Sequence, residues 1–321
     1  MQKEPVVIFT SCDENYFKHI PTLVMSIHEY MSQYEVRLFF LHTGIKEEEI
    51  AKVCALCDKL NISFEAILIE GETLEKYRIL KKLSSTESTF PAEGYLVCLP
   101  NLHLPEDVDR ALYLDAGDVI LAGDIADFYY SDFKGNMLTV SKGFASSWAY
   151  TSEDLYDRSK YLEIAAEYFN SGSVLFNVAL MRRMNINFDY YISILKLVRN
   201  IHDGYNWNTF GGGKRYVVHD DQGLLGVSFV GSINFYDPTN QENINTSYNF
   251  RPFVIECNKA KISNSEQLSL EMLKPKIIHL LGNKPGTSQE KRNELLQISK
   301  ECLALWDKFE GQARKLMEDL K

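Results

Sequence analysis

The sequence predicts an α/β domain built on a largely parallel sheet. Short apolar runs rich in β-branched residues alternate with amphipathic segments in the first part of the chain. Strands that alternate with helices favour parallel pairing, since each helix carries the chain back across the sheet. The 321 residues, 45% hydrophobic and 24% charged, suffice to bury such a core. Ligands of these sheets bind at the carboxyl ends of the strands, so polar residues there are candidates for function.

The N-terminal segments give the clearest elements. A buried strand is predicted over Val6–Ser11, and after a polar turn an apolar helical pattern runs from Ile20 to Met31. A second strand, Val36–His42, is followed by an amphipathic helix with an acidic first turn, Lys46–Leu60, and by a third strand, Ile62–Ile69. These elements predict two successive strand-helix-strand units at the start of the domain.

Shorter strands follow, and each adjoins polar residues. They are predicted over Ala111–Leu114, Val174–Phe176 and Ile277–His279, with a helical pattern from Tyr190 to Ile201. The glycine run at 211–213 lacks the spacing of a phosphate-binding P-loop and predicts a plain loop. The three short strands therefore supply the remaining places where a ligand is expected.

Residues 287–321 predict a C-terminal helical appendage to a domain that spans residues 1–286. Their pattern is that of a charged amphipathic helix or a pair of helices with a break at Gly311. Seven basic and seven acidic residues lie between Glu290 and Lys321, so no cationic excess draws this segment to anionic lipid. We expect its apolar positions to pack on the domain or on a second subunit. The oligomeric state and peripheral membrane contact stay open.

The composition excludes several functional classes. The net charge is −10, from 34 Lys and Arg against 44 Asp and Glu, and no basic cluster offsets it, so we expect no nucleic-acid partner. The six cysteines are too few for a disulfide scaffold, and Cys54 and Cys57 fall inside a predicted helix as core residues. No secretion signal and no apolar stretch of about 18 residues is found. We therefore expect a soluble, cytoplasmic protein without a transmembrane segment.

Two carboxylates follow the predicted strand Ala111–Leu114. Asp115 and Asp118, separated by a small residue and a glycine, could hold Mn²⁺ or Mg²⁺ against a diphosphate, because those ions prefer oxygen ligands. His279 ends another strand and could add an imidazole ligand. The same spacing fits an Asp-Gly turn with Asp118 as a cap, and a histidine at that place fits the core. The residues alone leave both interpretations open.

Polar residues also follow the first strand. Asp13 and Asn15 could pair with a base or a ribose, and Tyr16 could stack on an aromatic ring. The alternative is an Asx turn that caps the next helix. Both interpretations place these residues at the carboxyl end of the strand.

Two further polar runs lie beside predicted elements. The run Asn170-Ser171-Gly172 precedes a strand and either forms a plain turn or lines a pocket. Asp221 and Gln222 either cap a helix or present a carboxylate and an amide to a sugar hydroxyl. These residue types permit both kinds of role.

The order of these segments resembles glycosyltransferase family 8, the family of bacterial lipopolysaccharide galactosyltransferases and glucosyltransferases and of glycogenin. Five segments carry the resemblance in content, order and spacing, and they span residues 5–286: VVIFTSCDENY, RALYLDAGDVILAGDI, EYFNSGSVLFN, HDDQGLLGVSF and KIIHLLGNKPG. The resemblance implies a GT-A fold, in which a Rossmann-like nucleotide-binding mixed sheet is flanked by helices. It also implies a UDP-sugar donor and a divalent metal, Mn²⁺ or Mg²⁺, at an Asp-x-Asp motif.

Carried over position by position, the resemblance implies a role for each candidate residue. The nucleotide would be held by Ser11, Asp13, Asn15 and Tyr16, and the metal by Asp115, Asp118 and His279. The donor sugar would meet Asn170 and Gly172, the diphosphate would meet Gly282 and Lys284, and the catalytic residues would be Gln222 and Asp221.

Three positions depart from the family pattern. The Asp-x-Asp motif is lengthened to Asp115-Ala116-Gly117-Asp118, where Gly117 allows the backbone to bulge. Val97 stands where a basic residue commonly occurs, so that contact is either missing or supplied by another residue. The usual Lys-Pro-Trp ending is Lys284-Pro285-Gly286 here, and the absent Trp changes the packing expected near the acceptor.

These features together predict a metal-dependent, retaining hexosyltransferase. Such an enzyme moves glucose or galactose from a UDP-sugar to a hydroxyl of a glycan, glycolipid or glycoprotein acceptor. The alternative is a non-catalytic nucleotide-sugar or glycan-binding protein with a degenerate family 8 site. Release of UDP from a donor sugar separates the two hypotheses.

Overall fold

The computed structural model describes residues 4–84, 91–141, 169–202, 206–208, 214–216, 220–236, 248–259, 262, 264–282 and 285–320. The glycine run at 211–213 and Lys284 lie outside these residues. The strands of the main sheet are β1 (Val6–Ser11), β2 (Val36–His42), β3 (Ser63–Leu68), β4 (Ala111–Leu114), β6 (Leu138–Ser141), β7 (Ser173–Phe176) and β10 (Ile233–Tyr236). They form one mixed, seven-stranded sheet in the order β10-β6-β7-β4-β1-β2-β3.

Two antiparallel strand pairs lie outside the main sheet. The first joins β5 (Val119–Leu121) to β11 (Ile277–His279), and the second joins β8 (Asn206–Asn208) to β9 (Lys214–Tyr216). In the main sheet, β1, β2, β3 and β4 run parallel, whereas β7 runs antiparallel to both β4 and β6. The predicted α/β fold with a largely parallel sheet is confirmed.

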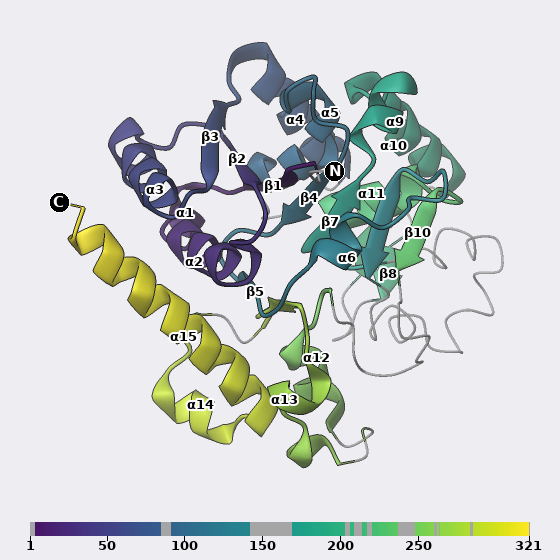
Figure 1. Cartoon of the computed structure of the whole chain (residues 1–321). Coiled ribbons are helices and arrows are strands. Elements are labelled where there is room, and N and C mark those ends of the chain that lie inside the picture. Colours follow the sequence, from purple (N-terminus) through teal and green to yellow (C-terminus); the bar gives the residue numbers. More distant parts are fainter. Residues whose placement is uncertain are drawn as a thin grey trace.

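Helices cover both faces of the sheet (Figure 1). On one side lie α1 (Glu14–Phe17), α2 (Ile20–Met31) and α3 (Glu47–Lys59), as expected from right-handed crossovers between β1, β2 and β3. The other side is covered mainly by α4 (Gly71–Ser84), the 3₁₀ helix η1 (Ala92–Cys98), α5 (Pro100–His103), α9 (Val178–Arg183), α10 (Phe188–His202) and α11 (Asp221–Ser228). The remaining elements are α6 (Ala126–Tyr129), α12 (Pro252–Asn258), η3 (Ser265–Gln267), α13 (Leu270–Leu273), α14 (Gln289–Glu294) and α15 (Gln297–Glu318).

The order in which strands are added to the sheet reverses at strand β1. From β1 the chain moves outward to β2 and β3, and it later returns to form β4 on the opposite side of β1. Aromatic side chains pack across the three neighbouring strands β1, β4 and β7, since the ring of Phe9 lies 5.2 Å from that of Tyr113 and 5.6 Å from that of Phe176, centroid to centroid. The reversal leaves space between the carboxyl ends of β1 and β4, which is where open α/β sheets bind ligands.

The C-terminal helix α15 packs along α2 (Figure 1). Trp306 is fully buried with its ring edge-on to His19, and Phe309 contacts Tyr30 in the same way. The predicted break at Gly311 is wrong, because α15 continues through it to Glu318. A glycine inside a helix costs about 1 kcal/mol relative to alanine, which burial of two large aromatic rings readily offsets.

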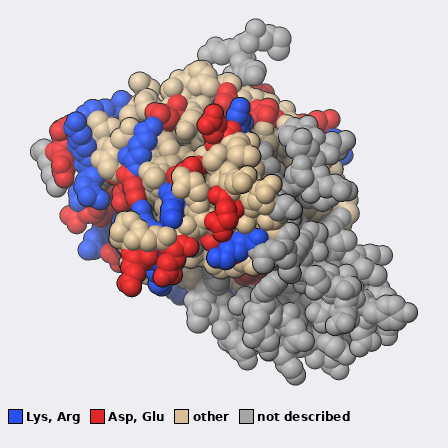
Figure 2. All heavy atoms as spheres, turned by 90° about the horizontal axis from the view of Figure 1, so that it is seen from below, with Lys and Arg blue, Asp and Glu red and all other residues tan. Residues whose placement is uncertain are grey.

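The described residues show how charge is distributed over the surface and how apolar the helices are. Basic and acidic side chains are intermixed over the described part of the face in Figure 2, without an extended patch of either sign. None of the helices in the described ranges is long and apolar enough to cross a membrane.

Candidate active site

A cleft of about 710 Å³ opens at the carboxyl ends of β1 and β4. Most of the residues that the sequence singled out line it together: Ser11, Asp13, Tyr16, Asp115, Asp118, Asn170, Asp221, Gln222 and His279. They come from five separate segments of the chain, and the fold brings them to one place because these segments adjoin the ends of strands or the start of a helix.

Three potential metal ligands converge in this cleft. Asp115 follows β4, Asp118 precedes β5, and His279 ends β11, which pairs with β5 so that His279 lies opposite Val119. The Nε2 atom of His279 is 3.2 Å from Asp118 Oδ1 and 3.7 Å from Asp115 Oδ2. One ligand atom from each residue lies within 4.8 Å of the other two. Asp118 and His279 are buried, whereas Asp115 is partly exposed to the cleft.

The extra residue in the acidic motif is accommodated by Gly117. Its φ of +101° lies in a region that side chains rarely adopt, and a Cβ there would come within 2.4 Å of the Tyr16 ring. Gly117 thus allows both the bulge between the two aspartates and the close approach of Tyr16. The longer spacing therefore still directs both carboxylates toward His279.

The hydrogen bonds around Asn170 determine which nitrogen of His279 carries the proton. Asn170 Oδ1 accepts from the backbone N–H of Gly172 at 3.2 Å, and a backbone N–H can only donate. His279 Nδ1, 3.0 Å from the same oxygen, must then carry a proton, so Nε2, which faces the two carboxylates, is the nitrogen left to coordinate a metal ion. A metal ion between them would be bound by this nitrogen together with the carboxylate oxygens. The arrangement therefore fits a hard divalent cation with mixed oxygen and imidazole ligands.

Asn170 also links the imidazole to Gln222. Gln222 Oε1 accepts from Asn170 Nδ2 at 3.0 Å and from the backbone N–H of Ser171 at 3.1 Å. Asn249 adds a further restraint, because its side-chain amide donates to both oxygens of Asn170. The network fixes the orientation of two amides and one imidazole that share the cleft.

The polar residues after β1 serve partly as a helix cap. The Asp13 carboxylate accepts from the backbone N–H groups of Asn15 and Tyr16, at 3.0 and 3.2 Å, and from the Asn15 side chain. This is the capping role that the sequence left open, and Asn15 itself is exposed and outside the cleft lining. Asp13 and Tyr16 still face the cleft, with the Tyr16 side chain 38% exposed. A planar ligand ring therefore has an aromatic surface to stack on.

The cleft is strongly acidic near Asp221. Part of the Asp221 side chain faces the cleft, yet burial raises the pKa of its carboxyl well above the ordinary value, and the carboxylates of Asp220 and Asp115 raise it further. Asp220, and not Asp221 or Gln222, caps α11, since its Oδ1 accepts from the backbone N–H of Gly223 at 2.9 Å. Asp221 and Gln222 occupy the first turn of that helix.

Other predicted positions lie at the margin of the cleft or outside it. Gly172 lies against His279, where a Cβ would come within 2.3 Å of Nδ1. Gly282, with a φ of +82°, lies against the ring of Phe253 and is not part of the lining. Val97 is fully buried in the core. The substitution at Val97 thus leaves no basic side chain there.

The lining also includes residues that were not predicted, among them Tyr113, Asp220, Glu93 and Arg251. Tyr113 donates from its hydroxyl to Asp115 Oδ1 at 2.8 Å, and strand alternation puts it on the same side as Asp115, a signal that the sequence offered. Asp220 adjoins a predicted residue. Glu93 and Arg251 belong to segments with no periodic pattern, so no sequence signal marked them.

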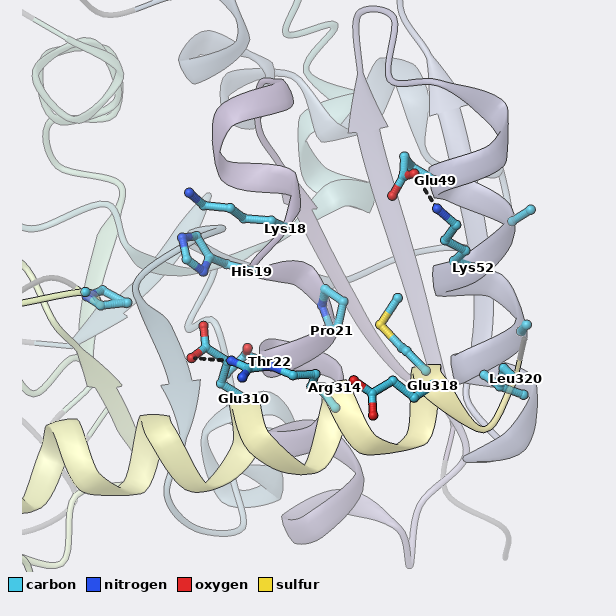
Figure 3. Close-up of a pocket in the computed structure, with 16 residues that line it drawn as sticks. Lys18, His19, Pro21, Thr22, Glu49, Lys52, Glu310, Arg314, Glu318 and Leu320 are labelled. Atoms are coloured by element: carbon cyan, nitrogen blue, oxygen red, sulfur yellow. Dashed lines mark hydrogen bonds and ion pairs between the residues drawn. The ribbon is translucent and has the colours of Figure 1, made fainter.

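A second hollow, of about 840 Å³, lies between the start of α2, helix α3 and the C-terminal half of α15 (Figure 3). Four of its charged side chains form two ion pairs, Lys52 with Glu49 at 2.5 Å and Arg314 with Glu310 at 3.6 Å. None of the predicted catalytic or metal-binding residues lines this hollow. Nothing among these charges points to a particular ligand.

Solved structures share the fold. The galactosyltransferase LgtC, in complex with donor and acceptor sugar analogs, is 19% identical over 94% of this chain and 96% of that chain, with a TM-score of 0.64. The bifunctional glycosyltransferase WbbM is 16% identical over 98% of this chain and 52% of that chain, with a TM-score of 0.61. The glycosyltransferase GlyE of Streptococcus pneumoniae is 18% identical over 95% of this chain and 60% of that chain, with a TM-score of 0.59. The fold is that of the GT-A glycosyltransferases.

A family model narrows this class. The model of glycosyl transferase family 8 matches residues 7–285, nearly the whole chain before α14. No curated protein sequence matches the chain. The chain therefore belongs to glycosyl transferase family 8, and the predicted resemblance is confirmed. Its activity class is that of a nucleotide-sugar-dependent glycosyltransferase.

Proposed function

We propose that the chain is a retaining hexosyltransferase that takes glucose or galactose from a UDP-sugar with the help of Mn²⁺ or Mg²⁺. The observation that carries the proposal is the convergence of Asp115, Asp118 and the Nε2 atom of His279 in one cleft. Galactosyl transfer by LgtC, which has the same fold, supports a hexose donor. The acceptor is a hydroxyl of a glycan, glycolipid or glycoprotein.

Three residues would hold the metal, namely Asp115, Asp118 and His279. A divalent ion bound by them would supply Lewis-acid charge against the diphosphate of the donor. The chain itself prepares this position, since Asn170 fixes the tautomer of His279 and Tyr113 holds one oxygen of Asp115. Gly282 and Lys284 would complete the diphosphate site.

The nucleotide would lie against Tyr16, with Ser11, Asp13 and Asn15 around the base and ribose. The exposed ring of Tyr16 supports stacking. The Ser11 hydroxyl donates to the backbone carbonyl of Glu93 at 3.4 Å, which connects β1 to η1 beside the expected base position. A nucleotide bound in this way would have its diphosphate next to Asp115 and Asp118.

Sugar transfer would occur beside Gln222 and Asp221, with Asn170 and Gly172 at the donor sugar. The acceptor hydroxyl attacks the anomeric carbon on the face from which UDP departs, its proton passes to the departing phosphate oxygen, and the configuration is retained. Gln222 orients the donor sugar in this step, because its amide is held by two hydrogen bonds and is a weak nucleophile. A variant of LgtC with an active-site glutamine changed to glutamate supports a functional glutamine in such a cleft. For a route through a covalent glycosyl-enzyme intermediate, Asp221 is the carboxylate that we propose as the nucleophile.

We further propose that residues 1–286 form the catalytic domain and residues 287–321 an appendage that stabilises it, in a soluble, cytoplasmic protein. The packing of α15 on α2 supports a stabilising role, because it buries Trp306 and Phe309, which do not line the cleft. This division predicts that changes in α15 alter stability more than nucleotide binding.

Release of UDP tests the function directly. UDP-glucose and UDP-galactose are incubated with Mn²⁺, with Mg²⁺ and with a chelator, and free UDP is measured. We expect metal-dependent release with one hexose preferred, and loss of release in Asp118→Ala with the fold intact, because a carboxylate at a strand end does not hold the core together. Tight UDP binding without release from any donor, with a panel of saccharide acceptors present, would instead indicate a non-catalytic binding protein.

A further inference from the structure

We propose that Arg251 binds the diphosphate of the donor and supplies the positive charge that is missing at Val97. The proposal rests on the proposed function, because it takes the ligand of the cleft to be a nucleoside diphosphate sugar. It adds a binding residue that neither the sequence pattern nor the resemblance indicated.

The charges of the cleft call for a cation of this kind. Carboxylate side chains line it at six positions: Asp13, Glu93, Asp115, Asp118, Asp220 and Asp221. Among the described residues of the lining, Arg251 is the only arginine or lysine. An anionic diphosphate entering this cleft meets strong repulsion, since like charges are poorly screened in a partly buried site. Two ligand carboxylates already offset the charge of one divalent ion, so a further cation is needed for the phosphates.

The backbone holds Arg251 at the metal end of the cleft. Phe250, its neighbour, forms a parallel bridge with Ile278: the N–H of Phe250 donates to Ile277 and the N–H of His279 donates to Phe250, both at 2.8 Å. The preceding Asn249 donates to the backbone and side-chain oxygens of Asn170, at 3.0 and 2.9 Å. Arg251 therefore directly follows a segment that is hydrogen-bonded to β11. Strand β11 ends at His279, one of the proposed metal ligands.

The residues that follow Arg251 contact Gly282, the glycine that we propose at the diphosphate. Pro252 starts α12, and the ring of Phe253 lies so close to Gly282 that a Cβ there would come within 2.5 Å. Helix α12 thus begins between the metal ligands on one side and Gly282 on the other. The diphosphate, which must bridge the metal and the sugar, lies within reach of a side chain at this place.

The chemistry of arginine suits this role. A guanidinium stays charged at all relevant pH values and donates two parallel hydrogen bonds to phosphate oxygens, which a lysine ammonium does not. The partly buried position of Arg251 at the cleft wall limits screening by solvent. The contact is therefore stronger than one made by an exposed surface cation.

The test compares ligands that differ only in their phosphates. The affinities of UDP and uridine are measured by ligand-observed NMR titration, with Mn²⁺ present, for the wild type, Arg251→Gln and Arg251→Lys. Arg183→Gln serves as the matched control, because Arg183 is an exposed arginine outside the cleft. We expect Arg251→Gln to weaken UDP binding about 10- to 100-fold and to leave uridine binding unchanged, with Arg251→Lys intermediate and Arg183→Gln like the wild type.

Two results would overturn the proposal, and they differ in what else they affect. If Arg251→Gln weakens UDP and uridine equally, or neither, Arg251 does not contact the diphosphate, while the proposed function stands. If the wild type itself shows no preference for UDP over uridine, the cleft is not a nucleoside diphosphate site, and the proposed function fails together with this inference.

Discussion

The substitution Gly172→Ala tests the metal site without changing any of its ligands. A Cβ at residue 172 would lie 2.3 Å from Nδ1 and 2.4 Å from Cε1 of His279, whereas ordinary contacts begin at 3.4 Å. The imidazole or the backbone must therefore move by about 1 Å. The φ of Gly172 is not in the left-handed region, so the effect is one of space and not of backbone strain.

The imidazole has little freedom to move by that amount. His279 is only 2% exposed, and its Nδ1 is bonded to Asn170 Oδ1, which lies 3.1 Å from the same new methyl group. Metal sites tolerate deviations in ligand distance of about 0.2 Å, several times less than the movement required. We expect a 10- to 100-fold loss of Mn²⁺ affinity and a loss of about 1 to 3 kcal/mol in the free energy of unfolding.

Calorimetric titration with Mn²⁺ and chemical unfolding of the metal-free chain measure the two effects. The matched control is Gly311→Ala in α15, where nothing lies within 4 Å of the new Cβ. It should keep the metal affinity and stabilise the chain by about 0.5 to 1 kcal/mol, because alanine favours a helix interior. An unchanged Mn²⁺ affinity in Gly172→Ala would refute the assignment of His279 as a ligand packed on residue 172.

Three further predictions concern the nucleotide, the core and pH. Tyr16→Ala should weaken UDP binding by one to two decades, since stacking on an aromatic ring contributes about 1 to 3 kcal/mol, and an unchanged dissociation constant in a fluorescence or calorimetric titration would argue against stacking. Trp306→Ala should lower the free energy of unfolding by about 3 to 5 kcal/mol in denaturant melts, because the side chain is fully buried, while UDP affinity stays as in the wild type; equal stability would show that α15 does not stabilise the domain. Burial lowers the pKa of His103, which is bonded to the Tyr77 hydroxyl, from 6.5 to about 4, so the unfolded chain binds a proton there that the folded chain does not; stability should fall by up to about 1.4 kcal/mol per pH unit as pH drops from 6.5 toward 4, and His103→Gln should lack this part of the slope. Wild type and variant with the same pH slope would contradict the last of these.

Much of the parallel half of the sheet could be predicted from local patterns. The boundaries of β1, α2, β2, β4 and β11 agree with the apolar runs, because buried strands and amphipathic helices impose the periodicities on which those predictions depend. The position of the cleft followed from the same reasoning, since polar residues after parallel strands meet at one edge of the sheet. The prediction of a helix break at Gly311 was wrong, because helix propensity is a weak signal compared with tertiary packing.

What could not be predicted depends on contacts between distant segments. Asn170 Oδ1 and His279 Nδ1 are 109 residues apart in sequence, and no local pattern shows that one selects the tautomer of the other. The segment that carries Arg251 is held at the cleft by an isolated β-bridge between Phe250 and Ile278, and Phe250 belongs to no regular strand. For Asp13 the sequence allowed a cap or a ligand contact, and the structure has the cap on a residue that also faces the cleft.

The coupling between metal and nucleotide tests the central claim most directly. The dissociation constant of UDP is measured by calorimetry with saturating Mn²⁺ and with a chelator, in the wild type and in Asp118→Ala. If Asp115, Asp118 and His279 hold a metal that meets the diphosphate, Mn²⁺ should tighten UDP binding at least about 10-fold in the wild type and by little or nothing in the variant. Equal UDP affinity with and without Mn²⁺ in the wild type, or the same tightening in Asp118→Ala, would contradict the account.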